Sequence, residues 1–143
     1  MNNGSVTLHA TCVAVAGAGV LITGPSGSGK SALALQLMAL GGVLVADDRT
    51  ILHREGRKLV AVPPVSIAGM IEARGVGILT VDYLDKVEVA LSIDMATLER
   101  ERLPQRHGAT VLDMELPCLY KLDAPYFPAA IHAYVCAIRK EIS

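Results

Sequence analysis

The sequence contains no tryptophan, one phenylalanine and four tyrosines among its 143 residues. The core must therefore be built from Val, Leu, Ile and Ala, which suits an α/β domain with buried strands. Hydrophobic residues make up 52% of the chain and charged residues 19%. This apolar content offsets the entropy cost of ordering the chain and excludes a disordered protein. The length predicts a single domain over residues 1–143.

The chain also lacks an excess of positive or negative charge. The formal net charge is −1, and no stripe of Lys or Arg is visible, so nothing indicates a nucleic-acid surface. No apolar run reaches the roughly 18 residues of a membrane span. The first residues carry no basic segment typical of a signal peptide. The three cysteines form no CxxC pair, which predicts reduced, mostly buried thiols. We therefore expect a cytoplasmic protein that binds neither membrane nor nucleic acid.

Apolar and β-branched runs predict the secondary structure of the first two thirds. We expect strands at 6–15, 20–23, 43–46, 78–81 and 87–93, and a hairpin over 49–62 that turns at Glu55-Gly56. Residues 30–40 predict a buried helix that ends at Gly41-Gly42.

The last third of the chain has weaker signals. Asp94 is a candidate cap for a short helix that ends before Pro104, and 109–116 is a candidate strand. Pro128 is expected to begin a terminal helix. On that helix an apolar stripe would pack on the core through Ile131, Tyr134, Val135 and Ile138.

One motif carries specific chemistry. Residues 24–31 read Gly-Pro-Ser-Gly-Ser-Gly-Lys-Ser, which satisfies the phosphate-loop pattern GxxxxGK[ST] between an expected strand and an expected helix. Glycines let the backbone approach anionic oxygens, and the N–H groups at the helix N-terminus bind phosphate. Lys30 would contact the β- and γ-phosphates, and Ser31 would offer its hydroxyl to Mg²⁺. We expect the whole loop to bind nucleotide through Gly24, Pro25, Ser26, Gly27, Ser28, Gly29, Lys30 and Ser31.

Carboxylates downstream of the loop bear on what happens to the nucleotide. Asp47 and Asp48 follow a buried strand, where one could accept a proton while the other contacts metal or a neighbouring amide. Glu72 is a candidate metal ligand, although its spacing also allows an ion pair with Arg74 on the same strand face. No NKxD-like base-reading motif of a GTPase is present.

Taken together, these residues make the chain resemble the catalytic domain of HPr kinase/phosphorylase, the bacterial enzyme that phosphorylates a serine of the phosphocarrier protein HPr. The resemblance rests on three segments, Gly19–Ser31, Leu44–Arg49 and Ile71–Leu79. It implies a P-loop domain of the HPr kinase/PEP-carboxykinase kind, an α/β fold with a mixed β-sheet and flanking helices. It also implies ATP and Mg²⁺ as cofactors, an HPr-like carrier as partner and a homo-oligomer, a hexamer in the family.

The resemblance assigns roles by position. Lys30 contacts phosphate, Ser31 and Glu72 hold Mg²⁺, and Asp47 is the base that acts on the substrate serine. His9 matches an active-site histidine upstream of the loop. Arg102 matches a catalytic arginine, with Arg100 and Arg106 as rivals for that role.

Two departures from the family pattern leave parts of the function open. The N-terminal domain of larger members is expected to be missing, which corresponds to a short form. The Pro-Gly-Arg-Asn-type segment that the family uses for dephosphorylation has no counterpart near Leu122–Ala130, so the reverse phosphorolysis stays open. A P-loop kinase acting on a small-molecule hydroxyl and a non-catalytic ATP-sensing module are the alternatives. The acidic residue assigned as the base favours an enzyme, because a sensing module has no use for one.

Overall fold

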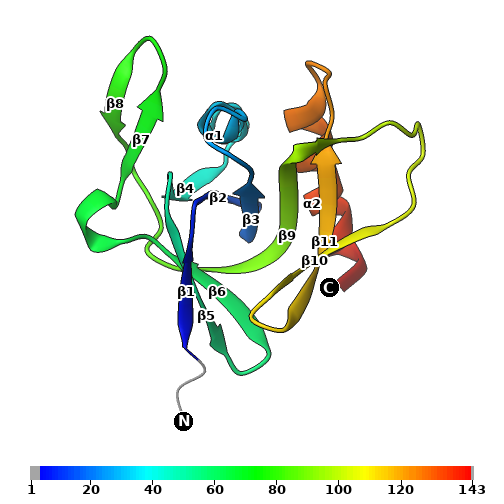
Figure 1. The fold of residues 1–143 in the computed structure, drawn as a ribbon, viewed down its shortest axis with the longest axis horizontal. Coiled ribbons are helices and arrows are strands. Elements are labelled where there is room, and N and C mark those ends of the chain that lie inside the picture. The colour runs from blue at the N-terminus through cyan, green and yellow to red at the C-terminus, as the bar shows by residue number, and fades with distance from the viewer. Residues whose placement is uncertain (1–3, 143) are drawn as a thin grey trace.

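The structure is a computed structural model. It describes the backbone of residues 4–142 and the side chains of residues 4–138. Its main sheet has the strand order β1-β5-β6-β9-β3-β2-β4, and β11 extends it by pairing with β9. The strands are β1 (Ser5–Leu8), β2 (Ala10–Val15), β3 (Ala18–Thr23), β4 (Val43–Ala46), β5 (Thr50–Glu55), β6 (Lys58–Val62), β9 (Val87–Leu98), β10 (His107–Val111) and β11 (Met114–Lys121). The expected mixed β-sheet with flanking helices is confirmed (Figure 1).

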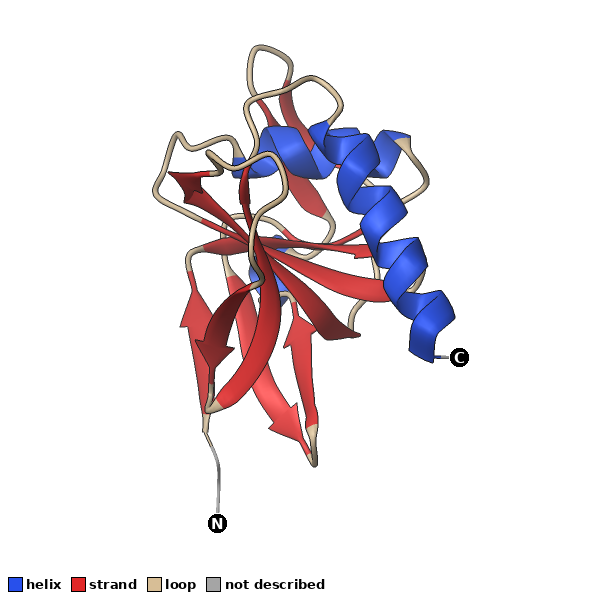
Figure 2. Cartoon of the chain, turned by 90° about the vertical axis from the view of Figure 1, so that its right-hand side faces the viewer, coloured by secondary structure: helices blue, strands red, loops and turns tan. Residues whose placement is uncertain are grey.

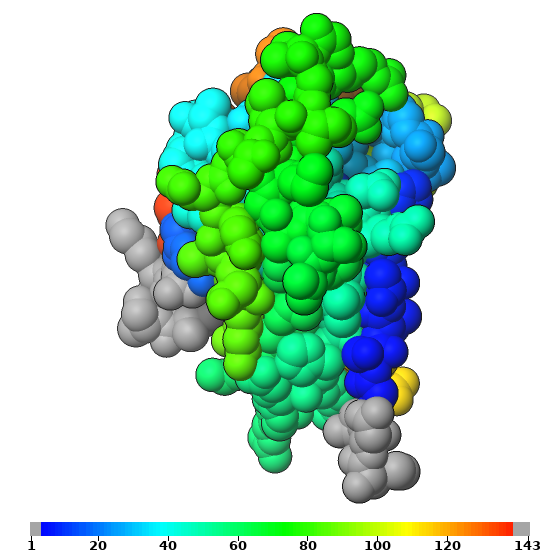
Figure 3. All heavy atoms as spheres, turned by 90° about the vertical axis from the view of Figure 1, so that its left-hand side faces the viewer, coloured from blue at the N-terminus to red at the C-terminus, as the bar shows by residue number. Residues whose placement is uncertain are grey.

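Two helices cover one side of this sheet, α1 (Lys30–Ala39) and α2 (Phe127–Ile142) (Figure 2). A short 3-10 turn, η1 (Val65–Ile67), leads into a separate two-stranded hairpin of β7 (Met70–Ala73) and β8 (Gly77–Thr80). This hairpin stands above the sheet and forms the top of the face shown in Figure 3. Neither helix within residues 4–142 is long and apolar enough to cross a membrane.

Strand alternation divides the buried side chains into two clusters. Val20 and Ile22 of β3 point to the helix side of the sheet, where they pack with residues of α1 and α2. Leu21, between them, points to the opposite cluster, which contains residues of β2, β5 and β6. Because both faces are covered, all six residues of β2 are buried. Buried strands of this kind are what the composition predicts.

The sheet gathers several strand ends at one edge. β3 runs parallel to β9, and β9 runs parallel to β11. β4 is antiparallel to β2, which is antiparallel to β3, so β4 also runs in the direction of β3. The carboxyl ends of these four strands therefore lie at the same end of the sheet. Ligands bind outside the carboxyl ends of strands in open α/β sheets.

The predicted helix after the glycine loop is confirmed, and so is its end. Gly41 has φ 101°, a left-handed conformation that suits glycine. Its N–H donates to Met38 O at 3.0 Å, and the N–H of Gly42 donates to Leu37 O at 2.9 Å. These bonds form a Schellman motif, which satisfies carbonyls at the end of α1.

Three predictions were wrong because of strand pairing. The expected strand 6–15 breaks at His9, where the chain leaves its pairing with β5 and begins pairing with β3 and β4. The expected strand 109–116 is a hairpin that turns at Leu112-Asp113, both with positive φ. The expected helix after Asp94 is part of β9 and a loop.

Asp94 nevertheless makes the local bonds of a cap. It accepts hydrogen bonds from Ala96 N–H at 2.8 Å and from the Thr97 hydroxyl at 2.9 Å. The register with β11 jumps from Asp94–Tyr120 to Leu98–Lys121, so these bonds lie in an irregular stretch of the strand. Two predictions differ from the structure by one residue: the hairpin turns at Gly56-Arg57, and Pro128 is the second residue of α2 instead of the first. Tyr134, which was expected in the packed stripe of α2, is exposed.

Candidate active site

The phosphate-loop motif connects the carboxyl end of β3 to the N-terminus of α1. Gly24 has φ 142°, and a Cβ there would come within 2.7 Å of Ser28 Oγ and 3.0 Å of Met95 Cβ. Gly29 has φ 99° and is the N-cap residue of α1. Both positions need glycine, and the second places free backbone N–H groups at a helix N-terminus.

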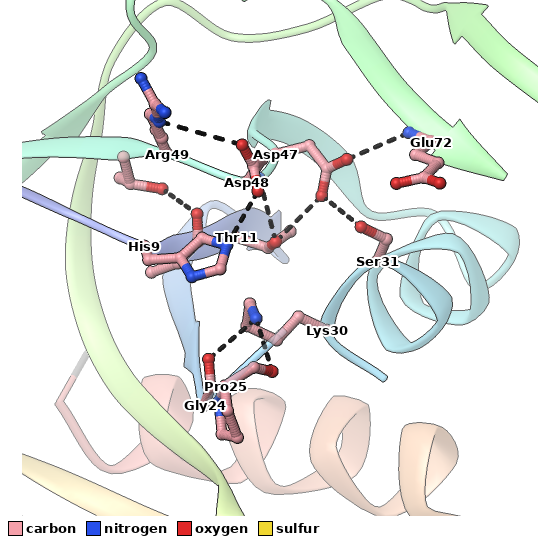
Figure 4. Close-up of polar contacts among 12 residues, drawn as sticks. His9, Thr11, Gly24, Pro25, Lys30, Ser31, Asp47, Asp48, Arg49 and Glu72 are labelled. Atoms are coloured by element: carbon pink, nitrogen blue, oxygen red, sulfur yellow. Dashed lines mark hydrogen bonds and ion pairs between the residues drawn. The ribbon is translucent and has the colours of Figure 1, made fainter. Parts of the chain in front are cut away.

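Lys30 is held over this loop. The residue is only 7% exposed, and its ammonium donates hydrogen bonds to the carbonyls of Gly24 at 2.8 Å and Pro25 at 3.0 Å. These contacts fix the charge next to the expected phosphate position (Figure 4). A charged donor with a third hydrogen to give is suited to a phosphate oxygen.

Asp47 lies at the end of β4 and is 5% exposed. Its Oδ1 accepts hydrogen bonds from the hydroxyls of Thr11 at 2.9 Å and Ser31 at 2.6 Å, and its Oδ2 accepts one from Glu72 N–H at 3.0 Å. One carboxylate therefore connects β2, α1 and β7 (Figure 4). Both of its oxygens are engaged by protein donors.

Asp48 has a different environment. Its backbone has φ 71°, and Arg49 N–H donates to Asp47 O at 2.8 Å, so Asp48 is the central residue of a γ-turn. A non-glycine residue in this conformation is strained, and such strain is often found at functional sites. The turn leaves its side chain 62% exposed and 2.9 Å from His9 Nε2. Arg49 Nε lies 3.9 Å from its other oxygen.

A cavity of about 370 Å³ opens above the loop. The loop and α1 form one wall, His9 and Asp48 a second, and the β7–β8 hairpin a third. Its lining residues are His9, Thr11, Ser26, Gly27, Gly29, Lys30, Ser31, Ala32, Leu35, Asp48, Glu72, Ala73, Arg74 and Val76. Asp47 does not line it. The structure thus brings His9, Lys30, Ser31 and Glu72 together with Asp48, from four separate segments.

The residues expected to hold Mg²⁺ fit that ion. Ser31 donates its hydroxyl hydrogen to Asp47, which leaves the lone pairs of its Oγ free for a cation. Glu72 adds a carboxylate on the cavity wall, and oxygen ligands are those that Mg²⁺ prefers. Among residues 4–138, whose side chains the structure describes, no group of three or more His, Cys, Asp or Glu is placed to hold a metal. Mg²⁺ usually takes one or two carboxylates and completes its shell with substrate phosphates and water.

The arginines expected near the reaction centre lie elsewhere. Arg100, Arg102 and Arg106 are exposed on the loop between β9 and β10, and none lines the cavity. The alternative ion pair of Glu72 with Arg74 is not formed within 4 Å among the described residues, and both side chains line the cavity. The other histidines bond elsewhere, His53 to Glu55 and His107 to Glu99. His132 Nδ1 lies 4.0 Å from Cys136 Sγ.

Two further residues contact the site and were not predicted from the sequence. Thr11 is fully buried on β2 and bonds Asp47, and Lys121 at the end of β11 donates to Ser28 O at 3.3 Å. Thr11 could have been found from its spacing, because it lies two residues after His9 on an apolar strand. Lys121 had no local signal, since its position depends on the parallel pairing of β11 with β9.

Comparison with known proteins places this architecture in a class. The model of the family described as HPr Serine kinase C-terminal domain matches residues 3–115, and the chain belongs to that family. Among solved structures, the chain is similar to the Hpr(Ser) kinase/phosphatase from Coxiella burnetii, with a TM-score of 0.81 and 29% identity. That match covers 96% of this chain and 98% of the other.

Proposed function

We propose that the protein is an ATP- and Mg²⁺-dependent kinase that phosphorylates a serine of HPr or an HPr-like carrier protein. Its family and its likeness to the Coxiella enzyme support a kinase of this type. One observation in this chain carries the proposal. A carboxylate, Asp48, faces a cavity that begins at the phosphate loop, and a histidine is bonded to it at 2.9 Å.

We assign the two aspartates differently from the positional match. Asp47 is an unsuitable base, because it is buried and each of its oxygens already accepts a hydrogen bond. It instead fixes Ser31 and the β7 backbone. Asp48 is the proposed base, because its carboxylate is open to the cavity and His9 holds its orientation.

The reaction would proceed in line. The substrate serine Oγ bonds to the γ-phosphorus as the bond from that phosphorus to the β–γ bridging oxygen breaks, and ADP leaves. Asp48 takes the serine proton, and Lys30 offsets charge on the phosphates. Mg²⁺ held by Ser31 and Glu72 would neutralise phosphate charge when bound. Arg102 is proposed to stabilise the transferred group only after loop movement or from a second copy in a homo-oligomer, for which a hexamer is the proposed state.

A transfer assay tests the proposal. The purified protein is incubated with γ-labelled ATP, Mg²⁺ and HPr-like carriers, with a carrier whose target serine is replaced by alanine as control. Label is expected on the carrier and absent from the control. Equal labelling of the control would contradict the serine assignment. ATP binding without transfer to any carrier would favour a small-molecule acceptor or an ATP-sensing module.

The same preparation tests the reverse direction. The similar Coxiella protein is named a kinase/phosphatase, so dephosphorylation is worth measuring here. Serine-phosphorylated carrier and inorganic phosphate are supplied, and pyrophosphate is quantified. Production of pyrophosphate would show that the segment around Leu122–Ala130 supports the reaction despite its different residues.

A further inference from the structure

A second cavity lies on the other flank of the phosphate loop. It has a volume of about 130 Å³, and its lining includes Gly29, Gln36, Met95, Lys121, Ala124 and Phe127. Gly29 and Ala32 line both cavities, so the loop and the start of α1 separate them. Figure 1 shows the β7–β8 hairpin on one side of α1 and the beginning of α2 on the other.

The sheet order gives the two flanks different chemistry. The carboxylates follow β4, and Lys121 ends β11, with the phosphate loop on β3 between them. In the proposed reaction, a triphosphate on the loop would place its γ-phosphate in the larger cavity, which Ser31 and Asp48 line. With that end at the β4 side, the nucleoside end would extend toward the β11 side of the loop.

The side chains of the second cavity suit a nucleoside. Phe127 and Met95 provide apolar surface for a flat base. Gln36 provides an amide that can both donate and accept hydrogen bonds. Lys121 brings a second ammonium to the loop, where its Nζ donates to Ser28 O at 3.3 Å. From that position it is within reach of a phosphate on the nucleoside side of the chain.

We propose that this second cavity binds the base and ribose of the nucleoside triphosphate, and that Lys121 is a positioning residue for its phosphates. The inference rests on the proposed nucleotide-dependent function. It divides the ligand between the two flanks, with the phosphoryl acceptor in the larger cavity and the nucleoside in the smaller one.

Calorimetric binding of two ligands tests the inference. MgATP and magnesium tripolyphosphate share the phosphate chain, but only ATP has a nucleoside. The wild-type protein is expected to bind ATP more tightly. Ala124→Leu, which fills the cavity, is expected to weaken ATP binding about tenfold and to leave tripolyphosphate binding unchanged. Ala129→Leu, at an exposed position of α2, is the matched control and should bind both ligands normally.

A second variant guards against misfolding. Gln36→Ala lies on an exposed helix face and favours the helix, so it should fold normally and selectively weaken ATP binding. If ATP affinity is unchanged in both variants, or if both ligands weaken together, the second cavity does not bind the nucleoside. If the wild-type protein binds neither ligand, the proposed function itself fails.

Discussion

At the scale of single residues, hydrogen bonding separates the work of two adjacent carboxylates. Asp47 is surrounded by three donors from three segments, and Asp48 is displayed by a strained turn beside His9. The alternation of side chains at a strand end indicates that the two acids differ, but it does not say which faces the ligand. That choice depends on where β2 and β7 place Thr11 and the Glu72 amide, which lie 36 and 25 residues away in the chain.

Asp47→Asn is expected to weaken Mg²⁺-dependent nucleotide binding about 10–100-fold, the usual effect of removing a group that orients a metal ligand. The amide cannot accept every bond that the carboxylate accepts, so the free energy of unfolding should also fall by about 1–3 kcal/mol. Titration calorimetry and denaturant unfolding measure the two effects. Unchanged Mg²⁺ affinity would show that Ser31 does not need this contact.

The cysteines test burial at the same scale. Burial raises the pKa of the Cys12 thiol to about 12, and it also raises the pKa of Cys118. A raised pKa keeps a thiol protonated at neutral pH, and the protonated form reacts poorly with alkylating reagents. Cys12 and Cys118 should therefore react only after denaturation, and half-buried Cys136 should react first. Mass spectrometry after timed alkylation identifies the sites. Fast labelling of Cys12 in the folded protein would contradict the packing of β2.

At the scale of elements, local signals predicted the glycine loop, α1 and its end, and β4, because these depend on neighbouring residues. The corner at His9 and the irregular stretch after Asp94 depend on partners far along the chain. Leu112-Asp113 lacks the glycine or asparagine that usually marks a two-residue hairpin turn, so that hairpin was missed. Pairing between distant strands overrode a valid capping signal at Asp94.

At the base of the loop between β9 and β10, Glu99 N–H donates to Lys121 O at 2.8 Å, and the Glu99 carboxylate is hydrogen-bonded to His107. Glu99 Oε1 lies 2.9 Å from His107 Nε2, and the His107 ring stacks on Tyr120 with centroids 3.7 Å apart. This histidine bond is the main cause that lowers the pKa of Glu99 below 4.5. A lowered carboxyl pKa gives stability that is present above the usual value and is lost as the pH falls through the lowered value.

Glu99→Gln is therefore expected to loosen the loop at neutral pH and speed tryptic cleavage after Arg100, Arg102 and Arg106. In the wild-type protein, hydrogen exchange in this loop should rise only below about pH 4.5. Glu55→Gln, which removes the charge from a comparable histidine contact in the β5–β6 hairpin, is the control. Equal cleavage rates in the two variants would mean that the pair does not hold the loop.

At the scale of the whole molecule, the sheet is the frame that brings the strand ends to one edge, and the two helices seal one of its faces. Ile131 of α2 is completely buried in the cluster that also contains Leu33 and Leu37 of α1. Helix α2 also contributes Phe127 to the second cavity. Packing of this helix is thus coupled to the phosphate-loop motif, whose Gly29 lines the same cavity.

Ile131→Ala is expected to reduce the free energy of unfolding by about 2–5 kcal/mol, because it removes buried methyl groups and leaves a void. Leu103→Ala, at a position 82% exposed, should change it little. Denaturant unfolding followed by circular dichroism measures both variants. A small loss for Ile131→Ala would show that α2 is not an integral part of the core.

The most direct measurement of the central claim is the rate of carrier serine phosphorylation by Asp48→Asn at saturating ATP and Mg²⁺. We expect a fall of about 10²–10⁴-fold, the contribution of a positioned general base, with ATP affinity unchanged. A rate close to that of the wild-type protein would contradict it. So would a loss of transfer confined to Asp47→Asn under the same saturating conditions, because the base would then be the buried carboxylate.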